Sequence, residues 1–294
     1  MPGENDYREQ FIRPIEKEGN VEKRLLLSRL IKPFVLRRKK DDVLLDLPEK
    51  TEEIAHCDLQ PEQRDLYAEI LTASRDKLLG ELQSNEQPVP YLHIFTLLSH
   101  LKQVCNHPAA YLKKPASYKE YKSGKWDLFL ELLEEARESQ QKVVVFSHYL
   151  SMLDIIEDYL KEHGIGFAAI RGATVDRGEQ LQRFNRDPQC EVFVGSLQAA
   201  GLGIDLTAAS VVIHYDRWWN AARENQATDR VHRIGQTRGV QVFKLVTKGT
   251  VEEHIDFLIA KKGRLMEEIV GVDDHQIIKR FDRQEMINLL QSLQ

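Results

Sequence analysis

The sequence predicts an α/β protein built on a parallel sheet that helices cover on both faces. Between residues 122 and 250, short apolar runs alternate with helical segments, which is the order that such a sheet requires. The runs are almost entirely apolar, as in Val143-Val144-Val145-Phe146, and this is typical of strands buried on both faces. With 294 residues, 42% of them hydrophobic and 30% charged, the chain can bury a core without disulfides or structural metal.

The elements of this sheet follow one another at regular intervals. We expect strands at 143–146, 167–170, 191–195, 211–215 and 240–246. We expect helices at 126–138, from Ser151 up to Gly164, at 177–185, at 221–233 and at 251–270. Ser151 and Asp154 have the spacing of a capping box at the start of the second helix.

Four regions divide the chain. Residues 1–57 mix charged and apolar patches, with prolines that include Pro14, Pro33 and Pro48, and are expected to form a connecting arm. Residues 58–121 repeat apolar positions at helical spacing, so they are expected to form a helical extension. The sheet occupies 122–250, and helices that brace it are expected in 251–294.

Charge and cysteine content exclude some classes of protein. The net charge of -5 argues against a histone-like coating of nucleic acid, although residues 29–40 hold six basic residues and no acidic one. None of the three cysteines lies in a Cys-x-x-Cys pair, so we expect reduced thiols rather than a disulfide framework or zinc site. No signal peptide or apolar run of about 20 residues is evident. These features predict an intracellular protein.

The sequence lacks the phosphate-binding loop Gly-x-x-x-x-Gly-Lys-Ser/Thr that an enzyme on this fold needs to hydrolyse nucleotides on its own. Ser123-Gly124-Lys125 contains a Gly-Lys pair, but it has no glycine five residues before Gly124 and follows no predicted strand. Neither a Gly-x-Ser-x-Gly elbow nor a His-Glu-x-x-His pair is present, and no metal site is expected.

Gln226, Arg230 and Arg233 are four and three residues apart, which would place them on one face of the predicted helix 221–233. Two guanidinium groups on one face suit a phosphate ligand. A solvated helix face with Glu224 and Asp229 as neighbours explains the same spacing, which alone does not decide between the two.

Several segments in order resemble motifs of the SWI/SNF family of ATP-driven DNA translocases, within helicase superfamily two. The resemblance covers nearly the whole chain and implies the second, C-terminal RecA-like lobe of such a protein. Ala200, Asp205 and Ala221 stand where that family more often has Gly, Asn and Pro. The segments that carry the resemblance are 36–43, 47–50, 103–108, 123–125, 143–148, 201–207, 226–236 and 249–253.

The resemblance implies a division of labour between two lobes. ATP and Mg²⁺ would lie between this lobe and a first lobe, absent from this chain, that brings the phosphate loop and the magnesium-binding acid. This lobe would supply Arg230 and Arg233 as arginine fingers. Nucleotide contacts would come from Gln226, Gly201, Gly203 and Asp205. The chain alone would hydrolyse little ATP.

The resemblance also implies double-stranded DNA as a partner, and nucleoprotein complexes as further partners. The expected DNA contacts lie mainly in loops after strands, where parallel sheets bind ligands. The location implied is the cytoplasm or nucleoid of a prokaryote, or the nucleus of a eukaryote. The expected DNA contacts are Ser147, His148, Arg171, Gly172, Thr174, Ser196 and Trp219.

Two other functions remain open from the sequence. The chain could be a stand-alone module that binds DNA or protein on a helicase-lobe fold without catalysis. A small-molecule-binding α/β domain is disfavoured because no Gly-x-Gly-x-x-Gly turn follows the first predicted strand. Each expected DNA contact could also be a turn residue that bonds its own backbone, and Trp219 could serve packing.

Overall fold

The computed structural model describes residues 10–11, 14, 20–31, 47–84, 88–200, 203–217, 221–257 and 281–293. The chain forms two compact units, Met1–Asp46 and Leu47–Gln294. In the first unit, helix α3 (Val21–Ile31) follows Asn20, whose side-chain oxygen accepts a hydrogen bond from the Lys23 N–H at 3.0 Å. This bond satisfies one of the backbone donors that the first turn of a helix leaves unpaired.

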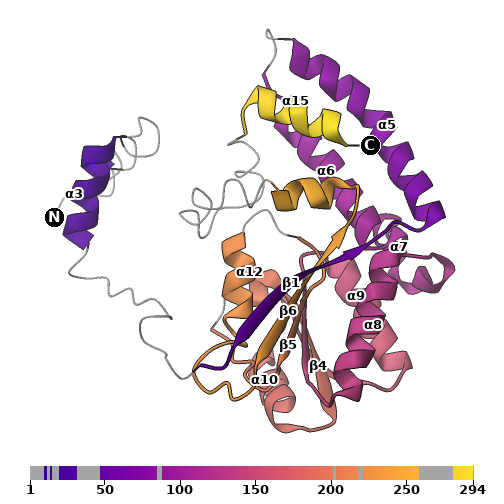
Figure 1. The fold of residues 1–294 in the computed structure, drawn as a ribbon, viewed down its shortest axis with the longest axis vertical. Coiled ribbons are helices and arrows are strands. Elements are labelled where there is room, and N and C mark those ends of the chain that lie inside the picture. The colour runs from indigo at the N-terminus through magenta and orange to yellow at the C-terminus, as the bar shows by residue number, and fades with distance from the viewer. Residues whose placement is uncertain are drawn as a thin grey trace. The chain divides into compact units, whose positions relative to one another are not determined.

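The second unit contains one six-stranded sheet in which every described pairing is parallel (Figure 1). Its strand order is β1-β6-β5-β2-β4-β3, so neighbours in space are mostly not neighbours in sequence. The predicted α/β parallel fold is confirmed. The strands are β1 (Lys50–Cys57), β2 (Val143–Ser147), β3 (Gly166–Ile170), β4 (Cys190–Ser196), β5 (Val211–His214) and β6 (Val240–Thr247).

Helices cover both faces of this sheet. Val143 and Val145 of β2 pack in one core with α8 (Gly124–Glu138) and α9 (Leu150–Glu162). Val144 and Phe146 point the other way and pack with residues of α10 (Arg177–Arg186), α11 (Leu197–Ala200) and α12 (Ala221–Thr228). The alternation follows from the two-residue period of a strand, and burial on both sides explains why β2 is apolar from Val143 to Phe146.

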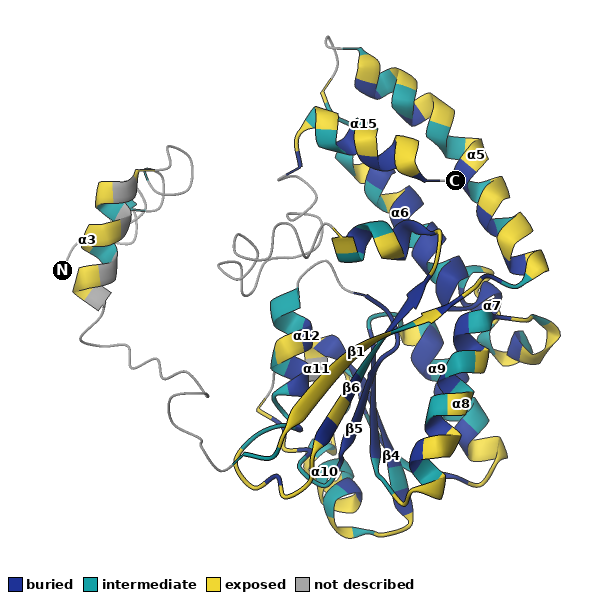
Figure 2. Ribbon diagram, in the orientation of Figure 1, coloured by how far each residue is buried: buried dark blue, intermediate teal, exposed yellow. Residues whose placement is uncertain are grey.

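Strand β1 differs from the sequence-based prediction. Residues 50–57 were expected to be part of a connecting arm, but they pair with β6 along their whole length, from Lys50 beside Val240 to Cys57 beside Thr247. The strand was missed because it lies at the edge of the sheet and is mostly exposed (Figure 2), so it lacks the apolar run of a buried strand. Charged residues such as Glu52 and Glu53 are typical of such an edge.

Two predicted helix ends are also wrong. Helix α12 ends at Thr228 rather than at residue 233, because the Arg230 and Val231 N–H groups bond back only three residues and the Arg230 carbonyl accepts from Leu206 N–H at 3.0 Å. Helix α9 begins after Tyr149 without a side-chain cap, so the capping box at Ser151 is not formed. The predicted helix 251–270 is described only over 251–257.

A helical bundle adjoins the sheet and is closed by the C-terminal segment (Figure 1). Leu289 and Leu290 of α15 (Arg283–Ser292) share a core with Leu78 and Leu101. None of the described helices is long and apolar enough to cross a membrane. The other elements of the bundle are α5 (Pro61–Gln83), α6 (Tyr91–Asn106), α7 (Pro108–Tyr111) and the 3₁₀ helix η3 (Pro115–Glu120).

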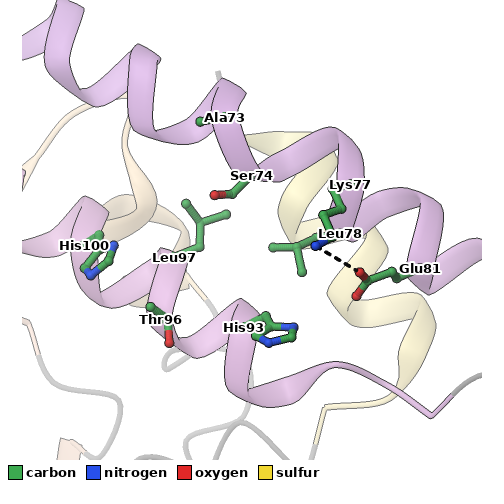
Figure 3. A pocket seen from close by; sticks show the side chains of 9 residues that line it. All are labelled: Ala73, Ser74, Lys77, Leu78, Glu81, His93, Thr96, Leu97 and His100. Carbon is green, nitrogen blue, oxygen red and sulfur yellow. Dashed lines mark ion pairs between the residues drawn. The ribbon is translucent and has the colours of Figure 1, made fainter.

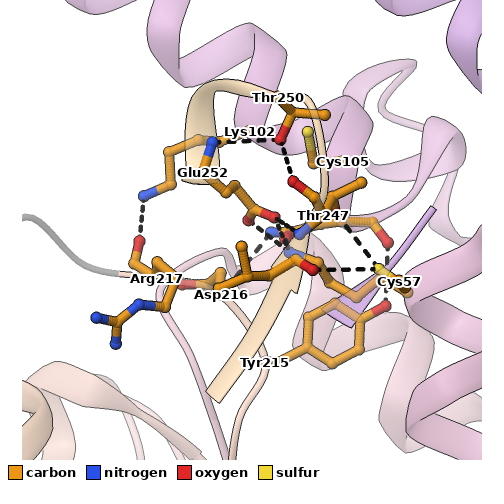
Figure 4. Close-up of polar contacts among 12 residues, drawn as sticks. Cys57, Lys102, Cys105, Tyr215, Asp216, Arg217, Thr247, Thr250 and Glu252 are labelled. Carbon is orange, nitrogen blue, oxygen red and sulfur yellow. Dashed lines mark hydrogen bonds and ion pairs between the residues drawn. The ribbon is translucent and has the colours of Figure 1, made fainter. Parts of the chain in front are cut away.

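A buried ion pair joins the bundle to the sheet. The Lys125 ammonium, in the first turn of α8, contacts the Glu252 carboxylate, and both side chains are fully buried. Lys125 also donates to the Asn106 side-chain oxygen at 3.1 Å, and Glu252 accepts from the Thr247 N–H at 3.0 Å (Figure 4). The pair therefore ties together α6, α8, the end of β6 and the helix at 251–257.

Lys125→Met should lower the free energy of unfolding by about 3–5 kcal/mol, because it leaves a buried carboxylate without its cation. Urea unfolding at neutral pH measures the change. Adding Glu252→Gln should restore part of the loss, since it removes the uncompensated charge and keeps an acceptor for Thr247. Lys122→Met, at an exposed position nearby, is the matched control; equal losses in both single variants would contradict the assignment.

His214, in the middle of the sheet, should make stability depend on pH. Burial, followed by the nearby charges of Lys244 and Arg217, lowers its pKa from 6.5 to about 3. Between about pH 3 and pH 6.5, His214 is protonated in the unfolded chain and neutral in the folded one. The free energy of unfolding therefore falls as the pH is lowered. His214→Gln should remove about 2 kcal/mol of the loss between pH 7 and pH 5. Urea unfolding at both pH values tests this; His56→Gln, on exposed β1, should keep the wild-type loss.

Candidate functional site

Three strand ends meet at the carboxyl edge of the sheet. Ser147 at the end of β2 lies beside Ser196 at the end of β4, and Ile170 of β3 lies beside Gly195. Arg171, which follows Ile170, is thus brought to the same edge. Parallel pairing therefore gathers residues from three separate segments, as the sequence-based argument expected for a ligand edge.

Asp216 organises the first of these loops. Its fully buried carboxylate accepts the Ser147 hydroxyl and the His148 N–H, the latter at 3.1 Å from Oδ1. Burial raises the pKa of Asp216, and Lys102 acts in the opposite direction. The Ser147 hydroxyl is therefore engaged within the protein. Asp216 was not among the expected site residues, although its position directly after a buried strand could have identified it.

Two cationic side chains, Lys102 and Arg223, lie near the ring of His148. Burial, and then the charges of Lys102 and Arg223, lower the pKa of His148 to about 3, so its ring is neutral at neutral pH. Lys102 comes from α6 of the bundle, donates to the Arg217 carbonyl at 2.6 Å (Figure 4) and lies 5.7 Å from the centre of the Tyr149 ring. Lys102 was missed because nothing in the sequence shows that α6 reaches the sheet edge.

The second loop, after β3, carries Arg171, Gly172 and Thr174. The Arg171 guanidinium pairs with Asp154 and Glu157 of α9, each at 2.6 Å. These pairs engage the side chain that the sequence suggested for DNA. Gly172 is exposed and Thr174 is half-buried, so the accessible part of this loop is its backbone.

The expected nucleotide residues form a second group. The Arg230 carbonyl accepts from Leu206 N–H, and Arg233 Nη1 donates to the Ile204 carbonyl at 3.5 Å. These bonds place the two arginines beside the segment that holds Gly203 and Asp205. Because α12 ends at Thr228, this arrangement comes from contacts between loops and not from a shared helix face.

The remaining expected residues are placed as follows. Gly203 is exposed and has a φ of +72°, in the left-handed region that glycine tolerates best. The exposed Asp205 accepts from Thr207 N–H at 3.2 Å. Gln226 is half-buried on α12, one turn before Arg230. Gly201 and Trp219 lie outside the described residues.

Arg217 anchors helix α12 to the helix at 251–257. Its buried guanidinium pairs with Glu224 of α12 and, at 2.5 Å, with Asp256 of the helix at 251–257. Because Lys102 holds the carbonyl of the same residue, Arg217 connects the bundle, the sheet edge and the segment that leads to Arg230. Loss of the Arg217 side chain would therefore release Glu224 and Asp256, while the carbonyl that Lys102 binds would remain.

A cavity of about 350 Å³ lies elsewhere, between α5 and α6 (Figure 3). Its walls include His93 and His100, and a Lys77–Glu81 ion pair of 4.0 Å lies at its side. All its lining residues belong to these two helices, so it is separate from the sheet edge. Within the described ranges, no three His, Cys, Asp or Glu side chains form a group that could hold a metal ion.

Two family models match separate segments of this chain, and longer proteins match most of it. Residues 124–235 match the helicase conserved C-terminal domain, and residues 3–110 match the SNF2-related domain. An uncharacterized ATP-dependent helicase of Mycoplasma pneumoniae is 35% identical over 99% of this chain and 27% of its own length. The putative ATP-dependent helicase/translocase YwqA of Bacillus subtilis is 37% identical over 90% and 29%. The chain thus spans less than a third of these two relatives.

Solved structures of SWI2/SNF2 ATPases also match this chain. The Sulfolobus solfataricus SWI2/SNF2 ATPase core in complex with dsDNA matches with a TM-score of 0.66 and 34% identity, over 98% of this chain and 59% of that one. The SWI2/SNF2 ATPase C-terminal domain of the same organism matches with a TM-score of 0.61 and 30% identity, over 81% of this chain and 96% of that one. The chain therefore belongs to the SWI/SNF family, and it contains that family's RecA-like helicase C-terminal domain.

Proposed function

We propose that this chain is the second lobe of the ATPase core of an ATP-driven double-stranded DNA translocase. The observation that carries the proposal is the position of Arg230 and Arg233 beside the segment with Gly203 and Asp205. The Arg233 guanidinium and the backbone of Arg230 lie next to an exposed glycine segment, and this suits the phosphates of a nucleotide, because the glycine lets a ligand approach the backbone closely. Relatives named as ATP-dependent helicases support the same assignment.

In this proposal the arginines act on ATP that a first lobe of the same protein holds with Mg²⁺. The metal ion would neutralise charge on the phosphate oxygens when bound, and its ligands would come from the first lobe. Arg230 and Arg233 stabilise the charge that develops on the transferred phosphoryl group. Such an arginine finger contributes about 10³–10⁵ in rate. Gln226, Gly201, Gly203 and Asp205 are the proposed nucleotide contacts around them.

The carboxyl edge of the sheet is the proposed DNA surface. The exposed backbone at this edge, as at Gly172, can bind phosphates without reading bases, as expected for a motor that moves along any sequence. The charges of Lys102 and Arg223 near His148 add attraction for a polyanion. Closure of the cleft by ATP would then move one lobe along the duplex relative to the other. The proposed contacts are Ser147, His148, Arg171, Gly172, Thr174, Ser196 and Trp219; of these, the Ser147 hydroxyl and both backbone groups of Arg171 also bond within the protein.

Arg230→Ala and Arg233→Ala should each lower DNA-stimulated ATP hydrolysis by about 10³-fold or more, since each removes positive charge needed in the transition state. DNA affinity should stay within about threefold of wild type. The assay needs the protein that includes the upstream lobe. Arg238→Ala, at an exposed position in the same segment, is the control. Near-normal turnover in either finger variant would refute its role, and turnover by this chain alone would refute the two-lobe scheme.

Gly172→Val should weaken DNA binding by about tenfold, roughly 1.4 kcal/mol. A Cβ added at Gly172 would meet no atom of the residues beyond its chain neighbours within 4 Å, so we expect the fold to be kept while the branched group stands where a phosphate would approach. Fluorescence anisotropy with a double-stranded DNA probe measures the affinity, and a thermal melt checks the fold. Gly80→Val on α5, which is equally uncrowded, should bind as wild type. Wild-type affinity in Gly172→Val would remove this loop from the DNA surface.

A further inference from the structure

The loop from Arg171 to Asp176 is held by an arginine that the motif analysis did not include. Arg177, the first residue of α10, donates from Nε to the Thr174 carbonyl at 3.0 Å and from Nη2 to the Gly172 carbonyl at 2.6 Å. One planar guanidinium thus spans two carbonyls of the same loop. Its fixed fork suits this task, because the two donors are set in one plane.

Further hydrogen bonds and ion pairs fix the rest of the loop. The Arg171 N–H donates to the Thr174 hydroxyl at 2.9 Å, and the Thr174 N–H donates to the Arg171 carbonyl at 3.2 Å. The Arg171 side chain is anchored to Asp154 and Glu157 of α9. The carbonyls of three loop residues are therefore all occupied from within the protein.

On the solvent side of the loop, the backbone is exposed rather than bonded to the protein. Gly172, Ala173 and Val175 are exposed, and the side chain of Val175 is almost completely so, at 97%. In the described part of the chain, the N–H groups of these three residues donate to no protein acceptor. Small side chains at Gly172 and Ala173 leave the backbone open, so these N–H groups are accessible, whereas the carbonyls of Arg171, Gly172 and Thr174 are occupied. Such a surface attracts an anion.

We propose that Arg177 is a positioning residue for a phosphodiester of the DNA backbone. It binds the carbonyls of Gly172 and Thr174 and so keeps the loop's free N–H groups available to the phosphate. Its own Nε and Nη2 are engaged by the loop, so it acts through the backbone and not as an ion-pair partner of DNA. This inference rests on the proposed DNA-binding function and adds a residue and a mechanism to it.

The two possible roles of Arg177 differ in what lysine can replace. A lysine keeps the charge, but its single ammonium lacks the planar fork that spans both carbonyls. A residue that only attracts DNA would tolerate lysine, whereas a positioning residue would not. The roles also differ in salt dependence, because each phosphate neutralised by a cation contributes about -0.9 to the slope of log K against log salt.

The test compares Arg177→Lys and Arg177→Gln with the same two changes at Arg183, which is exposed on the same helix and serves as control. The full protein with both lobes is used. DNA affinity is measured between about 50 and 200 mM salt, the range over which phosphate contacts dominate. Both Arg177 variants should bind about tenfold more weakly with the wild-type salt slope, and both Arg183 variants should bind within about twofold of wild type. Wild-type affinity in Arg177→Lys, or a slope reduced by about 0.9 in Arg177→Gln, would overturn the positioning role.

A second measurement separates this inference from the proposed function. Amide hydrogen exchange without DNA should become faster at Arg171 and Thr174 in both Arg177 variants, because their hydrogen bonds depend on the loop's shape, and should not change in the Arg183 variants. Unchanged exchange would overturn the positioning role whatever the DNA result. If the wild-type protein fails to bind DNA, the proposed function and the phosphate ligand are both refuted.

Discussion

The buried contact between Lys125 and Glu252 is the constraint on which the arrangement of the second unit depends. A charged pair without access to water is retained only where the geometry satisfies it, and here Asn106 and Thr247 complete its hydrogen bonds. Because the partners come from the bundle, the sheet and the segment after β6, the ion pair can form only when all three have assembled. It thus favours one relative placement of these parts, in addition to any stability that it contributes.

A second set of contacts carries this placement to the candidate site. Arg217 is held by Lys102 through its carbonyl and by Glu224 and Asp256 through its guanidinium. Lys102 belongs to the bundle, and Glu224 belongs to the helix that leads to Arg230. The proposed nucleotide and DNA groups are therefore connected through one residue next to the ion-pair network. The proposed translocase would need such a connection for a change at ATP to alter its affinity for DNA.

The sequence predicted the central sheet well, because β2, β4 and β5 are buried almost throughout and their apolar runs, such as Val143–Phe146, leave a clear pattern. It did not predict β1, since an exposed edge strand needs few apolar residues. The predicted end of α12 was wrong because the carbonyl of Arg230 accepts a hydrogen bond from the Leu206 N–H, a contact that no local pattern reveals. The site residues were suggested by motifs, but the roles of Asp216 and Lys102 arise from tertiary contacts, and that of Arg177 from the shape of the loop before it. Local sequence shows where a loop lies, whereas only the fold shows what holds it.

The pairing of β1 with β6 has a mechanical consequence. The chain enters the sheet at Lys50 and then runs parallel to β6 for eight residues. A pull along this strand from the preceding chain would load the ladder of hydrogen bonds in shear, so that many bonds share the force. A pull across the strand would break them one at a time. An edge strand in this orientation can therefore transmit tension into the interior of the sheet without peeling away from it.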